Sequence, residues 1–223
     1  MPIVKLLKEP PARKGFLPRE KFDALLTHTP ADLKPLVTFL YYCGVRLGEA
    51  LEITWDEVDL NAATIRLEED QTKSGEARIV PLPDVLIKML DAAEPKTGTV
   101  FSGTNLRKEW HKACVAAGLG TLTEVEGKPD PRYTGLIIHD LRRSAIRNLM
   151  KSGTSERVAM QISGHKTRWV FDRYHIVDES DVKQAMARVE AQVLPATPVA
   201  QVENGESSVK VMPRSRPKKR LTA

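Results

Sequence analysis

The sequence predicts a mainly α-helical protein with a small antiparallel β-sheet, a fold of the α+β class. Apolar residues recur at helical spacing in most segments between residues 17 and 193. Two short segments, 63–67 and 77–82, instead alternate in the manner of strands and flank a turn-rich segment. The 223 residues are enough for one large domain or two small ones, with a substantial core.

The first helices are predicted over 18–28 and 31–43. Pro18 suits the first position of a helix, and Gly44 provides a stop signal for the second one. Apolar side chains cover most of the circumference of the second helix, so we expect it in the centre of the core. A further short helix is predicted to begin just after Arg46.

The two predicted strands form a hairpin that carries Lys73 near its tip. Residues 119–135 are rich in glycine and proline, which predicts a loop. In the helix expected over 103–118, the residues predicted to point inward are Leu106, Trp110, Cys114 and Val115. The remaining helices are expected over 83–93, 139–150, 154–163, 168–175 and 178–193.

Composition indicates a cytoplasmic protein that does not enter a membrane. No apolar run approaches the roughly 20 residues that a membrane helix needs, and the N-terminus has no long apolar stretch typical of a signal peptide. The two cysteines, Cys43 and Cys114, both fall in apolar helical contexts, which predicts buried thiols in a reducing compartment.

Charge divides the chain unevenly. The formal net charge is +5, of which residues 195–223 carry +4 from six basic and two acidic side chains. The body of the chain is therefore close to neutral, and any basic surface on it must be local. We predict a lead-in segment over 1–16, one domain over 17–193 and a disordered basic tail over 194–223.

The helix that begins at His139 has one apolar stripe and one pair of polar residues near its start. Leu141, Ala145 and Leu149 recur every four residues, so they form the stripe. His139 and Arg142 are three residues apart and lie side by side. A proton-carrying imidazole beside a planar cation suits an anionic substrate, although an isolated pair of this kind usually belongs to a solvated basic face.

Other positions along the chain give this pair chemical meaning. Two arginines can clamp the oxygens of a phosphodiester, a tyrosine hydroxyl can attack the phosphorus, and a histidine can accept the tyrosine proton. A lysine on a hairpin can protonate the leaving oxygen. Together these groups are suited to metal-free phosphoryl transfer through a phosphotyrosine, without ATP. The candidate residues are Arg46, Lys73, His139, Arg142, His165 and, nine residues after His165, Tyr174.

This set resembles the tyrosine recombinase (phage integrase) family over about 16–193 of the chain. The matching pieces stand in the family's order: Gly-Val-Arg46-Leu-Gly-Glu49-Ala, Trp-Asp-Glu-Val-Asp-Leu60, the stretch from Thr-Lys73-Ser through Val-Pro-Leu82, His139-Asp-Leu-Arg142-Arg, Gly-His165 and Tyr174. The resemblance implies the catalytic-domain fold of enzymes that break and rejoin DNA. Ser163 departs from the pattern, since the family usually has an apolar residue before Gly-His.

The resemblance also implies a role for each residue and a set of partners. Tyr174 is expected to be the nucleophile, Arg46 and Arg142 to bind the scissile phosphate, and Lys73 to be the general acid. His139 is expected to exchange a proton with the tyrosine, His165 to donate a hydrogen bond to the phosphate, and Glu49 to orient the site. The expected partner is double-stranded DNA, with self-association as a tetramer through the C-terminal helix, and with no cofactor, metal, membrane or small-molecule substrate.

Three alternatives remain at this point. Members of the family usually carry a separate N-terminal helical domain, so the chain could be a truncated or non-catalytic relative that acts as a DNA-binding protein. His139, His165 and His175 could in principle bind zinc, but their spacing fits no compact ligand pattern. The C-terminal helix could serve an interaction module, although amphipathic helices more often pack on their own domain.

Overall fold

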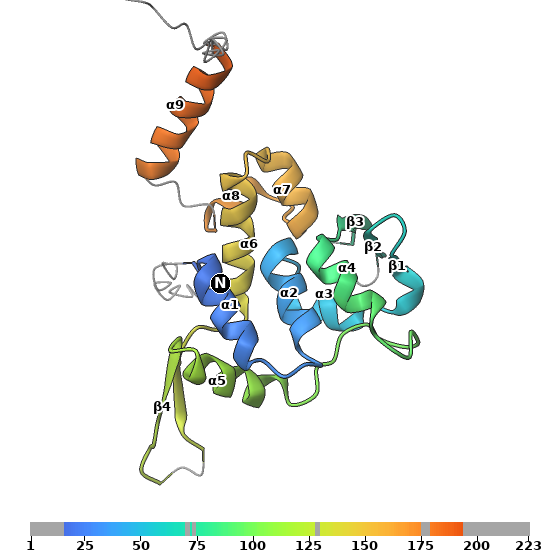
Figure 1. The fold of residues 1–223 in the computed structure, drawn as a ribbon, viewed down its shortest axis with the longest axis vertical. Coiled ribbons are helices and arrows are strands. Elements are labelled where there is room, and N and C mark those ends of the chain that lie inside the picture. The colour runs from blue at the N-terminus through green and yellow to red at the C-terminus, as the bar shows by residue number, and fades with distance from the viewer. Residues whose placement is uncertain (1–15, 70–71, 73–74, 128–129, 175–178, 194–223) are drawn as a thin grey trace, which may run out of the picture. The chain divides into compact units, whose positions relative to one another are not determined.

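The computed structural model describes residues 16–69, 72, 75–127, 130–174 and 179–193 (Figure 1). Contacts within the chain divide it into one unit up to Asp181 and a second unit from Val182, and each is described by itself. Among the described residues, no helix is both long enough and apolar enough to cross a membrane.

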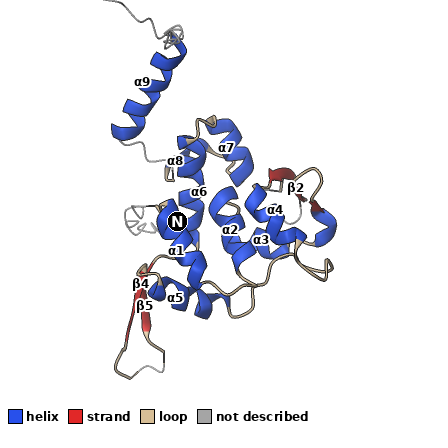
Figure 2. Ribbon diagram, in the orientation of Figure 1, coloured by secondary structure: helices blue, strands red, loops and turns tan. Residues whose placement is uncertain are grey.

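The first unit is mainly helical, with two small antiparallel sheets, so the predicted fold class is confirmed (Figure 2). Its helices are α1 (Arg19–His28), α2 (Lys34–Cys43), α3 (Leu47–Glu52), η1 (Trp55–Glu57, a 3-10 turn), α4 (Asp84–Asp91), α5 (Leu106–Ala116), α6 (His139–Lys151), α7 (Glu156–Ser163) and α8 (Arg168–Asp172). Its strands are β1 (Val58–Asp59), β2 (Thr64–Leu67), β3 (Arg78–Pro81), β4 (Gly120–Thr123) and β5 (Arg132–Gly135).

The predicted strand pair is present as β2 and β3, which are antiparallel with Ile65 opposite Val80. Both of these side chains are fully buried, as strand alternation requires for one face of the sheet. The short strand β1 adds to the other edge of β2, so the sheet has the order β1-β2-β3.

Helix α2 lies in the centre of the core, as its apolar composition predicts. Leu36, Val37 and Phe39 are at most 1% exposed, and α2 packs along α6 (Figure 1). Gly44 ends α2 with a φ of +64°, and a Cβ built there would lie 2.9 Å from the Cβ of Ala145 on α6. Glycine therefore permits both the left-handed turn and the close approach of the two helices.

The prediction of a loop over 119–135 is wrong, because β4 and β5 form an antiparallel hairpin there. Gly120 pairs with Gly135, and a Cβ built on Gly135 would lie 2.4 Å from the Cα of Gly120. The glycines that indicated a loop instead allow two strands and the ring of Tyr133 to pack closely. The hydroxyl of Tyr133 donates to the carbonyl of Leu136, 2.8 Å away, which fastens the hairpin just before α6.

Helix α5 is shorter at both ends than the predicted 103–118. Leu106, Trp110 and Cys114 are buried as predicted, but Val115 is 37% exposed, so its predicted inward orientation is wrong. The residue that completes the buried face is Ala113, which lies one turn after Trp110. Both cysteines are free and buried, as predicted.

Helix α9 (Glu179–Val193) begins in the first unit and continues into the second. The stripe expected over 178–193 is exposed at Val182, Met186, Val189 and Val193. The predicted domain limits at 16/17 and 193/194 remain predictions, since residues 1–15 and 194–223 lie outside the described residues.

Candidate active site

The first turn of α6 presents the predicted pair to one side of the molecule. Asp140 accepts a hydrogen bond from the backbone N–H of Ile137, 3.1 Å away, and so stabilises the start of the helix. Leu141 and Ala145 are fully buried, which anchors the predicted apolar stripe in the core. Because the apolar stripe holds α6 in the core, His139 and Arg142 are fixed on the neighbouring face of the helix.

His139 contacts the predicted nucleophile. Its ring nitrogen Nε2 lies 2.8 Å from the hydroxyl oxygen of Tyr174. Tyr174 follows α8 and is held there by the hydrogen bond from its N–H to the carbonyl of Phe171, whose own side chain is fully buried. Partial desolvation by the surrounding protein, and then the positive charge of Arg142, lower the pKa of His139. A neutral ring can accept the tyrosine proton.

Arg142 is buried, and its charge lies between the ends of two helices. Its Nη1 donates to the carbonyl of Gly44, at the end of α2, and to that of Ser163, at the end of α7, 2.5 Å away in the second case. The C-terminal end of a helix carries partial negative charge, which favours a cation there. Burial, and then the charge of Arg46, lower the pKa of Arg142 to about 10, so it stays protonated at neutral pH.

His165 lies against Arg142 and is neutral. The Nη2 atom of Arg142 lies 3.0 Å from its Nδ1 and 2.9 Å from its Nε2, and a guanidinium has only donors to offer. Burial, and then the charge of Arg142, lower the pKa of His165 to about 3. The hydroxyl of Ser163 lies 2.8 Å from Nδ1 of the ring. The serine that departs from the family pattern is therefore hydrogen-bonded in the site.

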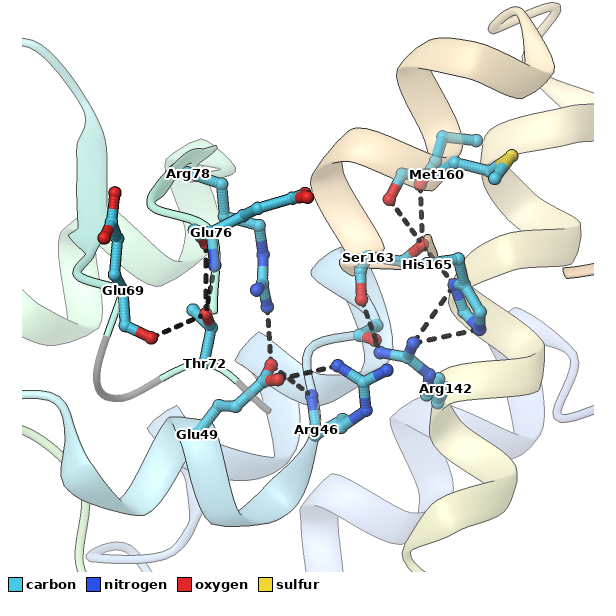
Figure 3. Close-up of polar contacts among 12 residues, drawn as sticks. Arg46, Glu49, Glu69, Thr72, Glu76, Arg78, Arg142, Met160, Ser163 and His165 are labelled. Carbon is cyan, nitrogen blue, oxygen red and sulfur yellow. Dashed lines mark hydrogen bonds and ion pairs between the residues drawn. The ribbon is translucent and has the colours of Figure 1, made fainter. Parts of the chain in front are cut away.

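Glu49 joins Arg46 to a further arginine (Figure 3). Oε1 of Glu49 accepts from Nη1 of Arg46 at 2.7 Å, and Oε2 accepts from Nη2 of Arg78 at 2.5 Å. Burial alone would raise the pKa of Glu49, but the hydrogen bonds and charges of Arg78 and Arg46 outweigh it, and the pKa is lowered. Glu49 is thus an ionised carboxylate in the interior.

Sequence reasoning did not identify Arg78. The strand prediction over 77–82 contained the signal, since Arg78 and Val80 share the face of the strand that turns inward. A charged residue on the buried face of a strand needs a partner of opposite charge in the interior. That partner is Glu49, 29 residues earlier in the chain.

The structure brings four of the six predicted residues into one cluster. The ring of Tyr174 lies 5.1 Å from that of His165 and 5.9 Å from the guanidinium carbon of Arg142, in addition to its contact with His139. Arg46 belongs to the adjacent group around Glu49, and Figure 3 shows it beside Arg142. Lys73 lies outside the described residues. Nearby, the buried hydroxyl of Thr72 accepts a hydrogen bond from the N–H of Glu76, 3.0 Å away.

Within the part of the chain that the structure describes, no three or more His, Cys, Asp or Glu side chains are grouped so that they could hold a metal ion. His175, one of the three histidines of the zinc alternative, lies outside that part.

A family-level match agrees with the order of these motifs along the chain. It also agrees with their convergence on one cluster and with the fold around them. Residues 16–180 match the Phage integrase family. The chain belongs to this family. That match covers all of the described site, from Arg46 to Tyr174, and it confirms the family that the sequence motifs indicate.

Individual relatives and solved structures agree. A tyrosine recombinase from Thermosipho africanus is 27% identical over 152 residues, which make up 66% of this chain and 50% of that protein. The catalytic domain of bacteriophage HP1 integrase has a TM-score of 0.57 at 25% identity, covering 78% of this chain and 95% of that domain. The integrase of the transposon Tn1549, solved in complex with circular intermediate DNA, has a TM-score of 0.57 at 16% identity, covering 82% of this chain and 68% of that one. The chain thus spans about half the length of the curated relative.

Proposed function

We propose that this chain is the catalytic part of a site-specific DNA recombinase or integrase. It cleaves and rejoins DNA strands through a covalent 3′-phosphotyrosine. The contact between Nε2 of His139 and the hydroxyl of Tyr174, at 2.8 Å beside the buried Arg142, carries this proposal. It joins a nucleophile, a neutral base and a fixed cation in one place.

In the cleavage step, the oxygen of Tyr174 attacks the scissile phosphorus. A bond forms between this oxygen and phosphorus, and the bond from phosphorus to the 5′-oxygen of the next nucleotide breaks. The tyrosine proton passes to Nε2 of His139, which is neutral because its pKa is lowered. The leaving 5′-oxygen takes a proton from Lys73, which we propose as the general acid.

The cationic residues stabilise the negative charge that develops on the non-bridging phosphate oxygens. Arg142 is positioned before DNA arrives, because two helix-terminal carbonyls hold its Nη1. Arg46 is 30% exposed at its side chain, so it remains accessible from outside. The neutral ring of His165 donates a further hydrogen bond to the phosphate.

Rejoining reverses these steps. A 5′-hydroxyl attacks the phosphotyrosine and returns its proton to Lys73, the bond between phosphorus and Tyr174 breaks, and the tyrosine oxygen recovers a proton from His139. The energy of the broken phosphodiester is retained in the phosphotyrosine, so the reaction consumes no ATP. No step in this scheme requires a metal ion.

Double-stranded DNA is the proposed partner, and we propose that the protein acts on it in the cytoplasm. The solved transposon integrase of the same fold, which is bound to DNA, supports this partner. We further propose that α9 mediates self-association on DNA as a tetramer. Its stripe of exposed apolar side chains, which includes Val182, Met186 and Val189, supports this role.

A covalent trap on DNA of random sequence tests the proposal. The protein is incubated in EDTA with a pool of duplexes that carry random sequence around a nick. When cleavage occurs next to the nick, a short fragment diffuses away and prevents rejoining. The proposal expects a protein–DNA adduct that survives a denaturing gel. Binding to the pool without any adduct would favour the non-catalytic alternative, and an adduct or cleavage that requires divalent metal would contradict the scheme.

A further inference from the structure

We propose that Arg78 is a positioning residue for DNA cleavage, whose charge neutralises Glu49 and thereby leaves the charge of Arg46 available to the scissile phosphate. This inference rests on the proposed function. It assigns a role to a residue to which the sequence analysis gives none. Arg78 acts through Glu49 and Arg46 and is not itself proposed to touch DNA.

The side chain of Arg78 is buried, so its charge acts on groups in the interior of the protein. Its side chain is 6% exposed and that of Glu49 is 3% exposed. The Nη2 atom of Arg78 donates to Oε2 of Glu49 at 2.5 Å. Among the described residues, its other buried nitrogens Nε and Nη1 have no hydrogen-bond partner. Glu49 is therefore the carboxylate that balances this buried cation in the described part of the chain.

Glu49 divides its two oxygens between two arginines. Oε2 faces Arg78, while Oε1 holds Nη1 of Arg46 at 2.7 Å (Figure 3). Two cations and one carboxylate leave one net positive charge in this group. Without Arg78, Glu49 would cancel the charge of Arg46, and its own negative charge would repel the incoming phosphate. The interior amplifies both effects, because screening by water is weak there.

Arg78 also lies against the segment that leads to His165. A Cβ built on Gly164 would lie 2.6 Å from the guanidinium carbon of Arg78. This close approach places β3 directly against the residue before His165. One buried side chain thus contacts the Glu49 group on one side and the His165 segment on the other.

The test compares Arg78→Met, Arg78→Lys, Glu49→Gln and the double variant Glu49→Gln/Arg78→Met. The measurement is the single-turnover rate of adduct formation as a function of DNA concentration, using a cleavable sequence recovered from the random pool. We expect Arg78→Met to lower the rate at saturating DNA by about 10-fold or more, as expected for a loss of roughly one charge contact. Arg78→Lys, which keeps the charge, should recover most of that rate. In the Glu49→Gln background, Arg78→Met should change the rate by less than about 3-fold.

A second substrate separates this electrostatic role from a purely structural one. Replacing the scissile phosphate by an uncharged methylphosphonate removes the charge that Arg46 attracts. The penalty of Arg78→Met should then shrink, whereas a penalty caused by a distorted fold would persist. Urea unfolding curves establish the folded fraction of each variant, and rates are compared only where that fraction is complete.

Several outcomes would overturn the inference. One is a wild-type rate in Arg78→Met. Another is an equal penalty of Arg78→Met with and without Glu49, which would mean that Arg78 does not act through Glu49. A third is an equal penalty on the charged and uncharged substrates. The absence of any adduct with the wild-type protein would instead contradict the proposed function.

Discussion

The ring nitrogen Nε2 of His139 lies 2.8 Å from the hydroxyl oxygen of Tyr174, although 35 positions separate the two residues in the chain. One residue begins α6, and the other follows the short helix α8. Their contact requires α6, α7 and α8 to fold back on one another around the fully buried Ile146, Ala159 and Phe171. The small cluster of apolar side chains therefore sets the distance on which the proposed proton transfer depends.

The pH dependence of cleavage should report on His139. Desolvation, and then the charges of neighbouring arginines, lower its pKa below the ordinary value of 6.5, so the ring is neutral and able to accept a proton at pH 7. We expect the single-turnover rate to be constant between pH 7 and 8 and to fall only as the pH drops below about 6.5. His139→Gln should be slow and should lack this acid limb. An acid limb centred above pH 7 would contradict the assignment.

Replacement of Arg142 should affect cleavage far more than DNA binding. Loss of one preorganised donor to a developing oxyanion costs about 3 kcal/mol, or roughly 100-fold in rate, so Arg142→Ala should slow adduct formation by at least that factor. The control is Arg66→Ala, which removes an arginine whose side chain is 65% exposed. Fluorescence anisotropy with labelled DNA measures binding. Equal adduct rates in the two variants would refute the clamp.

The junction between α2 and α6 should tolerate no side chain at Gly44. Gly44→Ala places a Cβ 2.9 Å from that of Ala145 and also forces alanine to a φ of +64°. The left-handed backbone alone costs about 1–2 kcal/mol, and the contact adds to it. Gly48→Ala is the matched control, because it lies in α3 with no atom within 4 Å of the new Cβ. Chemical denaturation should show a large loss of stability for the first variant and none for the second.

Acid should destabilise the fold through His165. Its pKa is about 3 in the folded protein against an ordinary value of 6.5, so the unfolded chain binds the additional proton between these values. The contribution of His165 to stability is therefore complete above pH 6.5 and is lost as the pH falls toward 3, at up to about 1.4 kcal/mol per pH unit. Urea unfolding at pH 7.5 and 5.5 should show a smaller difference for His165→Asn than for the wild type. An identical difference in the two proteins would contradict the neutral, buried ring.

Much of this architecture could be predicted because its signals are local. The periodicity of α2 and the glycine that ends it predict a central helix, and the alternation around Ile65 and Val80 predicts paired strands. The candidate residues could be named because their types and order match one chemistry and one family. The nine-residue spacing between His165 and Tyr174 also supports this match, since a short helix fits between the two residues.

The features that the sequence did not reveal depend on partners distant in the chain. The segment that forms the β4–β5 hairpin predicts a loop, because glycines such as Gly120 and Gly135 are typical of loops. In the folded protein these two positions need small residues because the two strands approach closely there. Arg78 escapes sequence reasoning because its partner Glu49 lies on another element, and no local pattern pairs the two. The serine at 163 similarly gains its hydrogen bond to His165 only through the turn at Gly164.

The location of the covalent bond tests the central claim most directly. After the adduct has formed on the nicked pool, nuclease and protease digestion leave a peptide that carries a nucleotide, and mass spectrometry identifies the modified residue. The account predicts that the nucleotide is attached to Tyr174, that Tyr174→Phe binds DNA but forms no adduct, and that Tyr42→Phe forms it at the wild-type rate. An adduct at another residue, or one that persists in Tyr174→Phe, would contradict the account.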